Sequence, residues 1–221
     1  MIKNKNIGQI FMQKAELYSL LSLIFSLEPS EDFCKILYKQ VFSEDYIPLG
    51  DYSNEIREKY NFIRQKMKKE SIEDFYNNFY KDYYYIFFNP KKMLASPWQS
   101  SYFNDGSLLF QEPNLICKKF YKKYKLDNNS NFPYDHIGLE INFLENLSYM
   151  ENNCHNDSIY ISEIVKDNIL FVDNMIEWVP LLHKRILTYI DNSYYVDFLE
   201  LLMILLVFDE NTLKEFYDVE I

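Results

Sequence analysis

Residues 7–32, IGQIFMQKAELYSLLSLIFSLEPSED, show the pattern that decides the fold. Their apolar side chains recur at helical spacing and form one broad stripe, made up of Ile10, Phe11, Leu17, Leu20, Leu21 and Ile24. Pro29 is a stop signal, and Ser30-Glu31-Asp32 has the N-cap and first-turn acids of another helix. The stretch therefore predicts two consecutive helices, over residues 7–27 and from Ser30 to about Phe42.

The same spacing continues along the rest of the chain. Capping and proline signals predict further helices over residues 53–69, 71–88, 113–125, 133–152, 158–178, 180–190, 193–208 and 211–218. Pro180 is expected to kink or divide the segment from 158 to 190. Sustained period-two alternation and Asn-Gly hairpin turns are absent, so strands are not expected. The sequence predicts an all-α bundle of about nine to eleven helices, in a single domain over residues 1–221.

Composition and charge argue against several classes of function. The net charge is −10 and the isoelectric point about 4.9, so nucleic acid and anionic lipid are not expected partners, because both need clustered cations. The longest apolar run, Leu201 to Phe208, is too short to span a bilayer. Cys34, Cys117 and Cys154 are far apart and lack CxxC spacing, which is typical of reduced thiols. We expect a cytoplasmic protein without stable membrane insertion.

Motifs for enzymatic chemistry are missing from the sequence. The four glycines do not cluster, so neither a P-loop nor a dinucleotide fingerprint is present, and GxSxG and HExxH are also absent. His155 lies in a polar connector, and His183 lies in a helical pattern that favours a partly buried polar residue over a ligand. We expect no catalytic centre, no metal and no cofactor.

One irregular stretch, ASPWQSSYFNDG over residues 95–106, is rich in aromatic residues. It lies within the longest irregular segment, residues 89–112, where residues 107–110 could add a short turn. Loops usually lie at the surface, so Trp98, Tyr102 and Phe103 need an explanation. Trp98 could fix the loop to the core, or it could bind a partner.

A second notable stretch is PYDHIGLE, residues 133–140. With Pro133 in the first turn of a helix, Asp135 would lie where the helix dipole favours negative charge. Glu140, four residues after His136, would share its face and could stabilise the charged imidazole. These residues could form a stable helix start, or a polar cluster for binding or for acid–base work.

The order of these stretches resembles the TorD/DmsD/NarJ family of cytoplasmic chaperones for molybdenum oxidoreductases. A helix ends at Ile86-Phe87-Phe88-Asn89-Pro90, and a loop with Ser96-Pro97-Trp98 and Tyr102 follows. Leu108-Leu109-Phe110 comes next, and then Pro133-Tyr134-Asp135-His136 with Glu140. The family pattern has glycine at the position of Asn89 and glutamate at that of Phe132. These departures predict altered peptide contacts near Phe132.

The resemblance implies a non-catalytic chaperone that binds the twin-arginine signal peptide of an apo-molybdoenzyme and delays export until the cofactor is inserted. An apolar groove would take the leader's hydrophobic stretch, and carboxylates would face its arginines. The expected peptide-binding residues are Phe87, Pro97, Trp98, Ser100, Tyr102, Pro133, Asp135, His136 and Glu140. We expect Trp98, Tyr102, Asp135, His136 and Glu140 to lie around one concavity.

The sequence leaves two other functions open. One is assembly of a non-exported nitrate-reductase-type enzyme. The other is nucleotide hydrolysis that uses Asp135-His136, and the resemblance also implies weak guanine-nucleotide binding. The oligomeric state is expected to be a monomer or a domain-swapped dimer.

Overall fold

Serine caps begin three helices where the sequence predicts them. The side chain of each serine accepts a hydrogen bond from the backbone N–H three residues further on, which satisfies a donor that the first turn leaves unpaired. Ser30, Ser53 and Ser71 in this way begin α2 (Glu31–Ile36), α3 (Asn54–Met67) and α4 (Ile72–Phe87).

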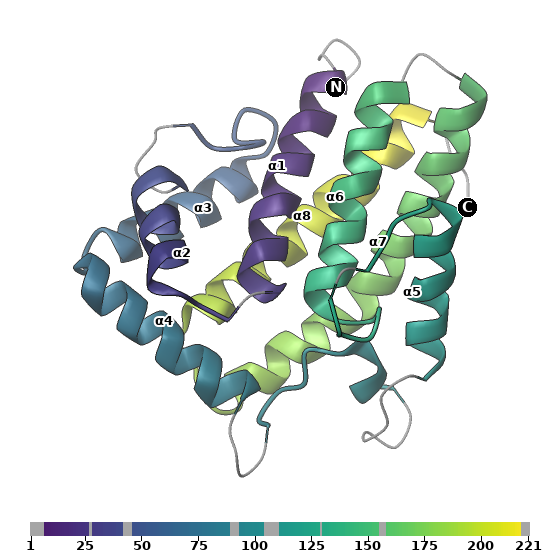
Figure 1. Cartoon of the computed structure of the whole chain (residues 1–221). Coiled ribbons are helices and arrows are strands. Elements are labelled where there is room, and N and C mark those ends of the chain that lie inside the picture. The colour runs from purple at the N-terminus through teal and green to yellow at the C-terminus, as the bar shows by residue number, and fades with distance from the viewer. Residues whose placement is uncertain are drawn as a thin grey trace.

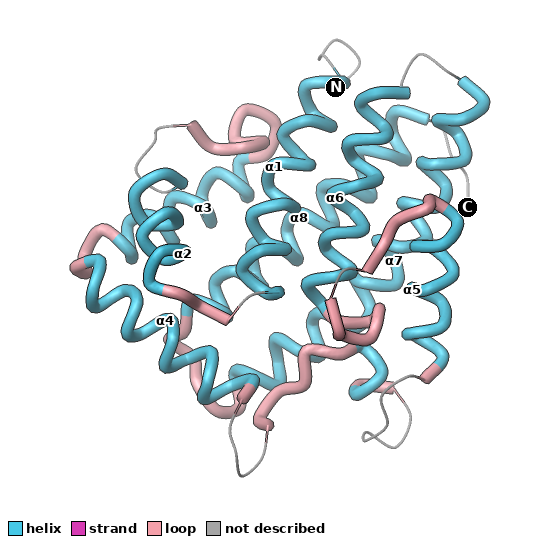
Figure 2. The backbone as a smooth tube through the Cα atoms, viewed as in Figure 1, coloured by secondary structure: helices cyan, strands magenta, loops and turns pink. Residues whose placement is uncertain are grey.

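The computed structural model describes residues 7–26, 28–41, 46–88, 93–103, 111–128, 130–154 and 158–217. Within these ranges every element is helical, so the all-α class is confirmed (Figures 1 and 2). The remaining α-helices are α1 (Ile7–Ser26), α5 (Glu112–Lys123), α6 (Ile137–Cys154), α7 (Ser158–Leu187) and α8 (Tyr194–Tyr217). Two short segments complete the set, the π-helical η1 (Leu37–Val41) and the 3-10 turn η2 (Gln99–Ser101).

The two longest helices correct the predicted boundaries. Pro180 lies inside α7, which is continuous, because Trp178, Val179 and Leu182 around it are buried and their packing outweighs one missing hydrogen bond. A break near residues 209–210 was also expected, yet α8 continues through Asp209, whose side chain is buried.

The start of α6 is a further correction. This helix begins at Ile137 rather than at Pro133, because residues 134–135 form a turn and His136 pairs with the loop before α5. Asn89, Pro90, His155 and the short turn expected at 107–110 lie outside the described residues.

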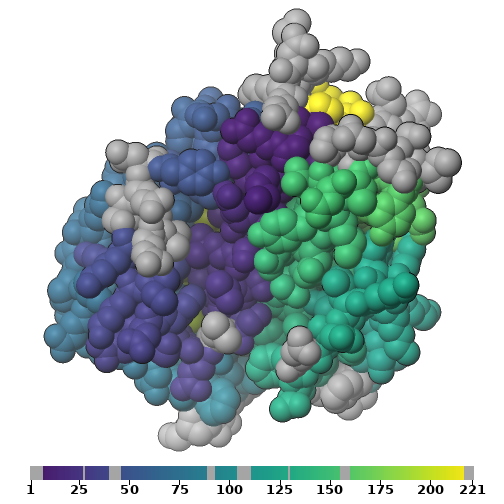
Figure 3. Space-filling model, turned by 45° about the horizontal axis from the view of Figure 1, so that its top comes forward, coloured from purple at the N-terminus to yellow at the C-terminus, as the bar shows by residue number. Residues whose placement is uncertain are grey.

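The helices pack around a central pair. α1 and α6 contact each other most extensively, followed by α7 with α8 and α6 with α7. Figure 1 shows α2, α3 and α4 on one side of this centre and α5 on the other, and Figure 3 shows α1 (purple) and α6 (green) sharing one face of the molecule. One cluster of buried residues draws on all eight α-helices of the described residues. Among the described residues, no helix is long and apolar enough to cross a membrane.

A group of charges is buried between these helices. Lys14 of α1 contacts Glu151 of α6 at 2.6 Å and Asp209 of α8 at 2.7 Å. Tyr18 donates a hydrogen bond to Asp209 at 2.9 Å, and Asn168 of α7 donates one to Glu151 at 2.6 Å. We call these five residues the buried charge cluster. Burial of ions is tolerated only with such partners, so the cluster fixes how four helices meet.

Candidate functional site

The aromatic loop is attached to the start of α6 by backbone pairing. Gln99 N–H donates to the carbonyl oxygen of Asp135 at 2.9 Å, and Ile137 N–H donates to that of Pro97 at 2.8 Å. Trp98 and His136 thereby form an isolated antiparallel β-bridge. Two segments more than thirty positions apart therefore form one rigid junction, which we call the loop–α6 junction (residues 96–102 and 132–140).

Asp135 holds the junction together from inside. Its side chain is 0% exposed, and Oδ2 accepts hydrogen bonds from the Ser100 N–H at 2.9 Å and from the Ser100 hydroxyl. Asp135 was expected to face the arginines of a peptide, but its buried carboxylate does not reach the surface. Both loop donors reach Oδ2, whereas Oδ1 is buried and accepts no hydrogen bond among the described residues.

His136 caps α6 rather than carrying a charge. Its Nδ1 accepts the Gly138 N–H at 3.2 Å, which satisfies one of the unpaired donors of the first turn. The side chain is only 4% exposed, and burial lowers its pKa to about 3. The imidazole is therefore neutral near pH 7. The expected stabilisation of a charged His136 by Glu140 is wrong, because the histidine is held in its neutral form.

Glu140 points into the core behind the junction. Its Oε2 accepts a hydrogen bond from Trp178 Nε1 at 2.8 Å, and the Cys117 thiol donates to Oε1 at 3.5 Å. The carboxyl group is fully buried, and this burial raises its pKa to about 8 although both donors lower it. Like Asp135, Glu140 is not available to a surface peptide. Sequence reasoning missed Trp178, since nothing local to it points to a partner 38 positions away.

Phe132 and Trp98 cover the buried ring of His136 on the outside of the junction. Phe132 stacks on His136 with ring centroids 4.5 Å apart, and Trp98 meets His136 edge-on at 5.6 Å. Phe132 is 38% exposed and Trp98 is half-buried. We call these residues the aromatic cluster. The predicted proximity of Trp98 and His136 is confirmed, whereas the concavity and the binding of a peptide stay predictions.

Other predicted residues lie behind this surface. Tyr102 is half-buried, donates a hydrogen bond to the Ser96 carbonyl oxygen at 2.8 Å and packs on Trp178 at 5.7 Å. Phe87 is buried against Tyr195 at 5.2 Å, so it belongs to the core and not to a groove. Pro97 and Pro133 are also buried, within the junction. The arrangement offers an apolar aromatic surface on a fixed backbone.

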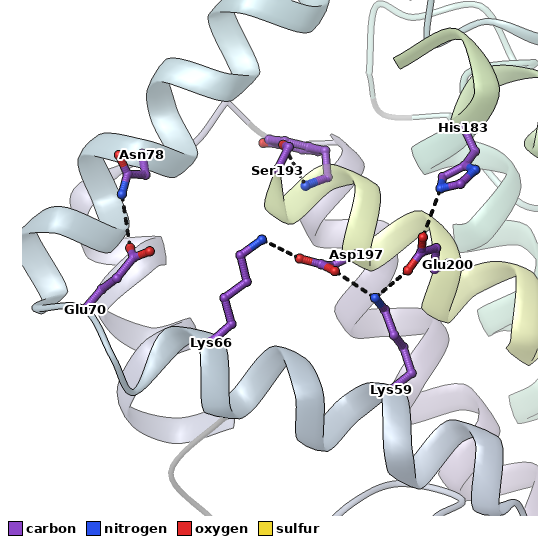
Figure 4. Close-up of polar contacts among 9 residues, drawn as sticks. Lys59, Lys66, Glu70, Asn78, His183, Ser193, Asp197 and Glu200 are labelled. Atoms are coloured by element: carbon purple, nitrogen blue, oxygen red, sulfur yellow. Dashed lines mark hydrogen bonds and ion pairs between the residues drawn. The ribbon is translucent and has the colours of Figure 1, made fainter. Parts of the chain in front are cut away.

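A polar network elsewhere was not anticipated from the sequence (Figure 4). Lys59 and Lys66 of α3 each contact Asp197 of α8 at 2.7 Å, and Lys59 also contacts Glu200. His183 of α7 lies 3.3 Å from Glu200, which agrees with the partly buried polar residue expected at this position. This network joins α3 and α7 to α8 with alternating charges, so its arrangement is that of a helix-to-helix contact. The described residues contain no group that could hold a metal ion.

Comparison with known proteins identifies related sequences. A family model for the nitrate reductase delta subunit matches residues 50–184, which include every residue of the loop–α6 junction. Chaperone protein TorD of Aliivibrio fischeri is 26% identical over 76% of this chain and 79% of its own length. Chaperone protein TorD of Vibrio vulnificus strain YJ016 is 23% identical over 91% and 94%. A proposed redox enzyme maturation protein from Archaeoglobus fulgidus has a solved structure with a TM-score of 0.47 and 21% identity, over 91% and 93% of the two chains.

Proposed function

Because this chain belongs to the nitrate reductase delta subunit family, we propose that it is a cytoplasmic chaperone for the maturation of a molybdenum oxidoreductase. The single observation that carries this proposal is the family match over more than half of the chain, which spans the whole loop–α6 junction. The relatives named as TorD chaperones match along most of both lengths. The chaperone would hold the apo-form of its client until the molybdopterin cofactor is inserted.

A binding role fits the chemistry of the junction better than a catalytic one. Asp135 and His136, the pair considered for nucleotide hydrolysis, are 0% and 4% exposed. Both already serve the fold, Asp135 through Ser100 and His136 as the cap of α6. A general base must reach the proton that it removes, and neither side chain can do so without opening the junction. Weak guanine-nucleotide binding and the oligomeric state stay predictions.

The aromatic cluster is the surface proposed to bind the client's leader peptide. Trp98 and Phe132 present apolar area on a backbone that is already fixed, so little ordering entropy is lost on binding. Trp98 is an aromatic anchor of the kind that dominates binding energy at interfaces. Phe132 replaces the glutamate of the family pattern with an apolar ring, which favours the hydrophobic stretch of a leader over its charged part.

Assembly of a non-exported nitrate-reductase-type enzyme is the second candidate. The description of the matching family, nitrate reductase delta subunit, favours it directly. The two functions differ in the client, because only an exported client carries a twin-arginine leader. The identity of a reductase encoded beside this gene, with or without such a leader, separates them.

Titration calorimetry with leader peptides tests the proposed binding. Synthetic leaders of the organism's molybdenum reductases are titrated into the wild-type protein and into the variant Trp98→Ala. We expect one leader to bind, and Trp98→Ala to weaken its binding by about 1–3 kcal/mol, because a large anchor is lost. High salt should change this loss little, since the contact is apolar.

A matched control uses Tyr149→Ala, which removes an exposed aromatic of α6 outside the junction. This variant should bind as the wild type does. Equal affinity of wild type and Trp98→Ala, with both proteins folded, would place the binding site elsewhere.

A further inference from the structure

The arginine pair of a twin-arginine leader needs a negative surface, and the buried Asp135 and Glu140 do not provide one. A different surface combines exposed carboxylates with aromatic faces. Tyr76, Tyr80, Tyr84 and Phe88 follow one another at every fourth position along α4 and just beyond its end. Their ring centroids are 5.7, 4.6 and 5.5 Å apart in that order, so the rings form a continuous row on one face of the helix. We call this row the tyrosine ladder.

Carboxylates border the tyrosine ladder on the side of α2. Glu28 accepts a hydrogen bond from the Tyr84 hydroxyl. Glu31 and Glu73 line, together with Tyr76, a cavity of about 340 Å³ between α2 and the start of α4. Lys35 also lines this cavity, but its charge is paired with that of Glu31. The three glutamates and Lys35 together therefore carry a net negative charge.

We propose that this α2–α4 surface binds the arginine pair of the client's leader, while the apolar stretch that follows lies on the aromatic cluster. The inference rests on the proposed function and adds the place where the charged part of the leader binds. Guanidinium groups stack on aromatic faces and form paired hydrogen bonds with carboxylates. The tyrosine ladder and its glutamates offer both kinds of contact side by side.

The two surfaces are connected through the end of α4. The N–H groups of Leu94 and Ala95 donate to the carbonyl oxygen of Ile86 at 3.1 and 3.2 Å, so the loop toward Trp98 starts beside the last turn of the helix. The ladder from Tyr76 to Phe88 extends about 18 Å along the helix. Ala95 lies at most about 11 Å from Trp98 along the chain.

Added end to end, these lengths reach at most about 30 Å, which about nine extended residues would span. That length fits an arginine pair followed by the beginning of an apolar stretch. The order of polar and apolar groups along the ladder is Glu31 and Glu73 beside Tyr76, then Glu28 at Tyr84, and then Phe88, which is 63% exposed and lies nearest the loop.

Calorimetry at low salt with two synthetic leaders tests the inference. One carries the arginine pair, and the other has glutamine at both positions. We expect the wild type to bind the arginine peptide with about tenfold higher affinity, because the free energies of two modest surface contacts add. The triple variant Glu28→Gln, Glu31→Gln, Glu73→Gln should reduce this preference to about twofold or less and still bind the glutamine peptide as the wild type does. The matched control, which changes charge equally at exposed sites on α3 and α7, is Glu55→Gln, Glu58→Gln, Glu177→Gln.

A second variant, Tyr80→Leu, keeps every charge and removes one ring of the ladder. It should lower the preference for arginine about two- to fivefold. An unchanged preference in both the triple variant and Tyr80→Leu, or an equal loss in the control triple, would overturn the inference and leave leader binding intact. Failure of the wild type to bind either peptide would overturn leader binding itself and the inference with it.

Discussion

Two side chains at the loop–α6 junction, Glu140 and His136, have pKa values that burial moves away from their ordinary values. Burial keeps Glu140 protonated to a higher pH and keeps His136 neutral to a lower one. For Glu140 the pKa in the folded protein, about 8, lies above the ordinary value of 4.5. Its contribution to stability is therefore complete below pH 4.5 and is lost as the pH rises through 8. For His136 the order is reversed, and stability is lost as the pH falls from 6.5 toward 3.

The variant Glu140→Gln isolates the first of these effects. Glutamine still offers an oxygen to the Trp178 N–H and has no charge to bury. The free energy of unfolding of the variant, relative to that of the wild type, should rise by about 1–3 kcal/mol between pH 5 and pH 8.5. Urea unfolding at several pH values measures this difference. Parallel profiles for the two proteins would show that Glu140 does not titrate in this way.

The burial of Asp135 illustrates what a local sequence pattern leaves undetermined. The family resemblance of the stretch Pro133 to Glu140 predicted that the aromatic loop and the helix start lie close together. The Trp98–His136 bridge confirms this. The same pattern suggested exposed carboxylates. Whether the Asp135 carboxylate is exposed depends on hydrogen bonds from Ser100. That residue is 35 positions away, so the sequence around Asp135 does not indicate the contact. Trp178 was missed as the partner of Glu140 for the same reason.

At the scale of elements, local signals predicted the serine-capped helix starts well, but the start of α6 and the continuity of α7 and α8 were not predicted. Serine caps act within one turn, so Ser30, Ser53 and Ser71 could be recognised in the sequence. Pro180 was expected to kink or divide the segment from 158 to 190, and the structure excludes the division, because the packing around Trp178 outweighs the hydrogen bond that proline removes. Helix propensity is thus overridden where the chain is most deeply buried.

Gly138 sets the distance between α1 and α6. A Cβ atom at this position would lie 2.1 Å from Ser26 Oγ and 2.9 Å from the Ser26 backbone nitrogen. Gly138→Ala should therefore lower the free energy of unfolding by about 1–3 kcal/mol, although alanine is the better helix former. Chemical denaturation measures the loss. Adding Ser26→Gly should restore part of it by removing the closer contact, and a fully stable Gly138→Ala protein would contradict the close approach.

At the scale of the whole molecule, the buried charge cluster joins the N-terminal helix to the last one. Replacing Lys14 by methionine leaves Glu151 and Asp209 buried without their cation. We expect Lys14→Met to cost about 3–5 kcal/mol in the free energy of unfolding, because an uncompensated buried charge is expensive. The combined variant Lys14→Met, Glu151→Gln, Asp209→Asn should recover much of that cost, since no charge is left to bury. Equal free energies of unfolding for the single and the combined variant would show that the cost of Lys14→Met does not come from uncompensated charge.

The central claim, that this chain is a maturation chaperone for a molybdenum oxidoreductase, is tested most directly by the molybdenum content of the client. The reductase encoded with this chain is produced in cells with and without it, purified, and analysed for molybdenum per polypeptide. We predict that the client made with the chaperone carries nearly its full complement of metal, and that the client made without it carries substantially less. Equal molybdenum content in the two preparations would contradict the account.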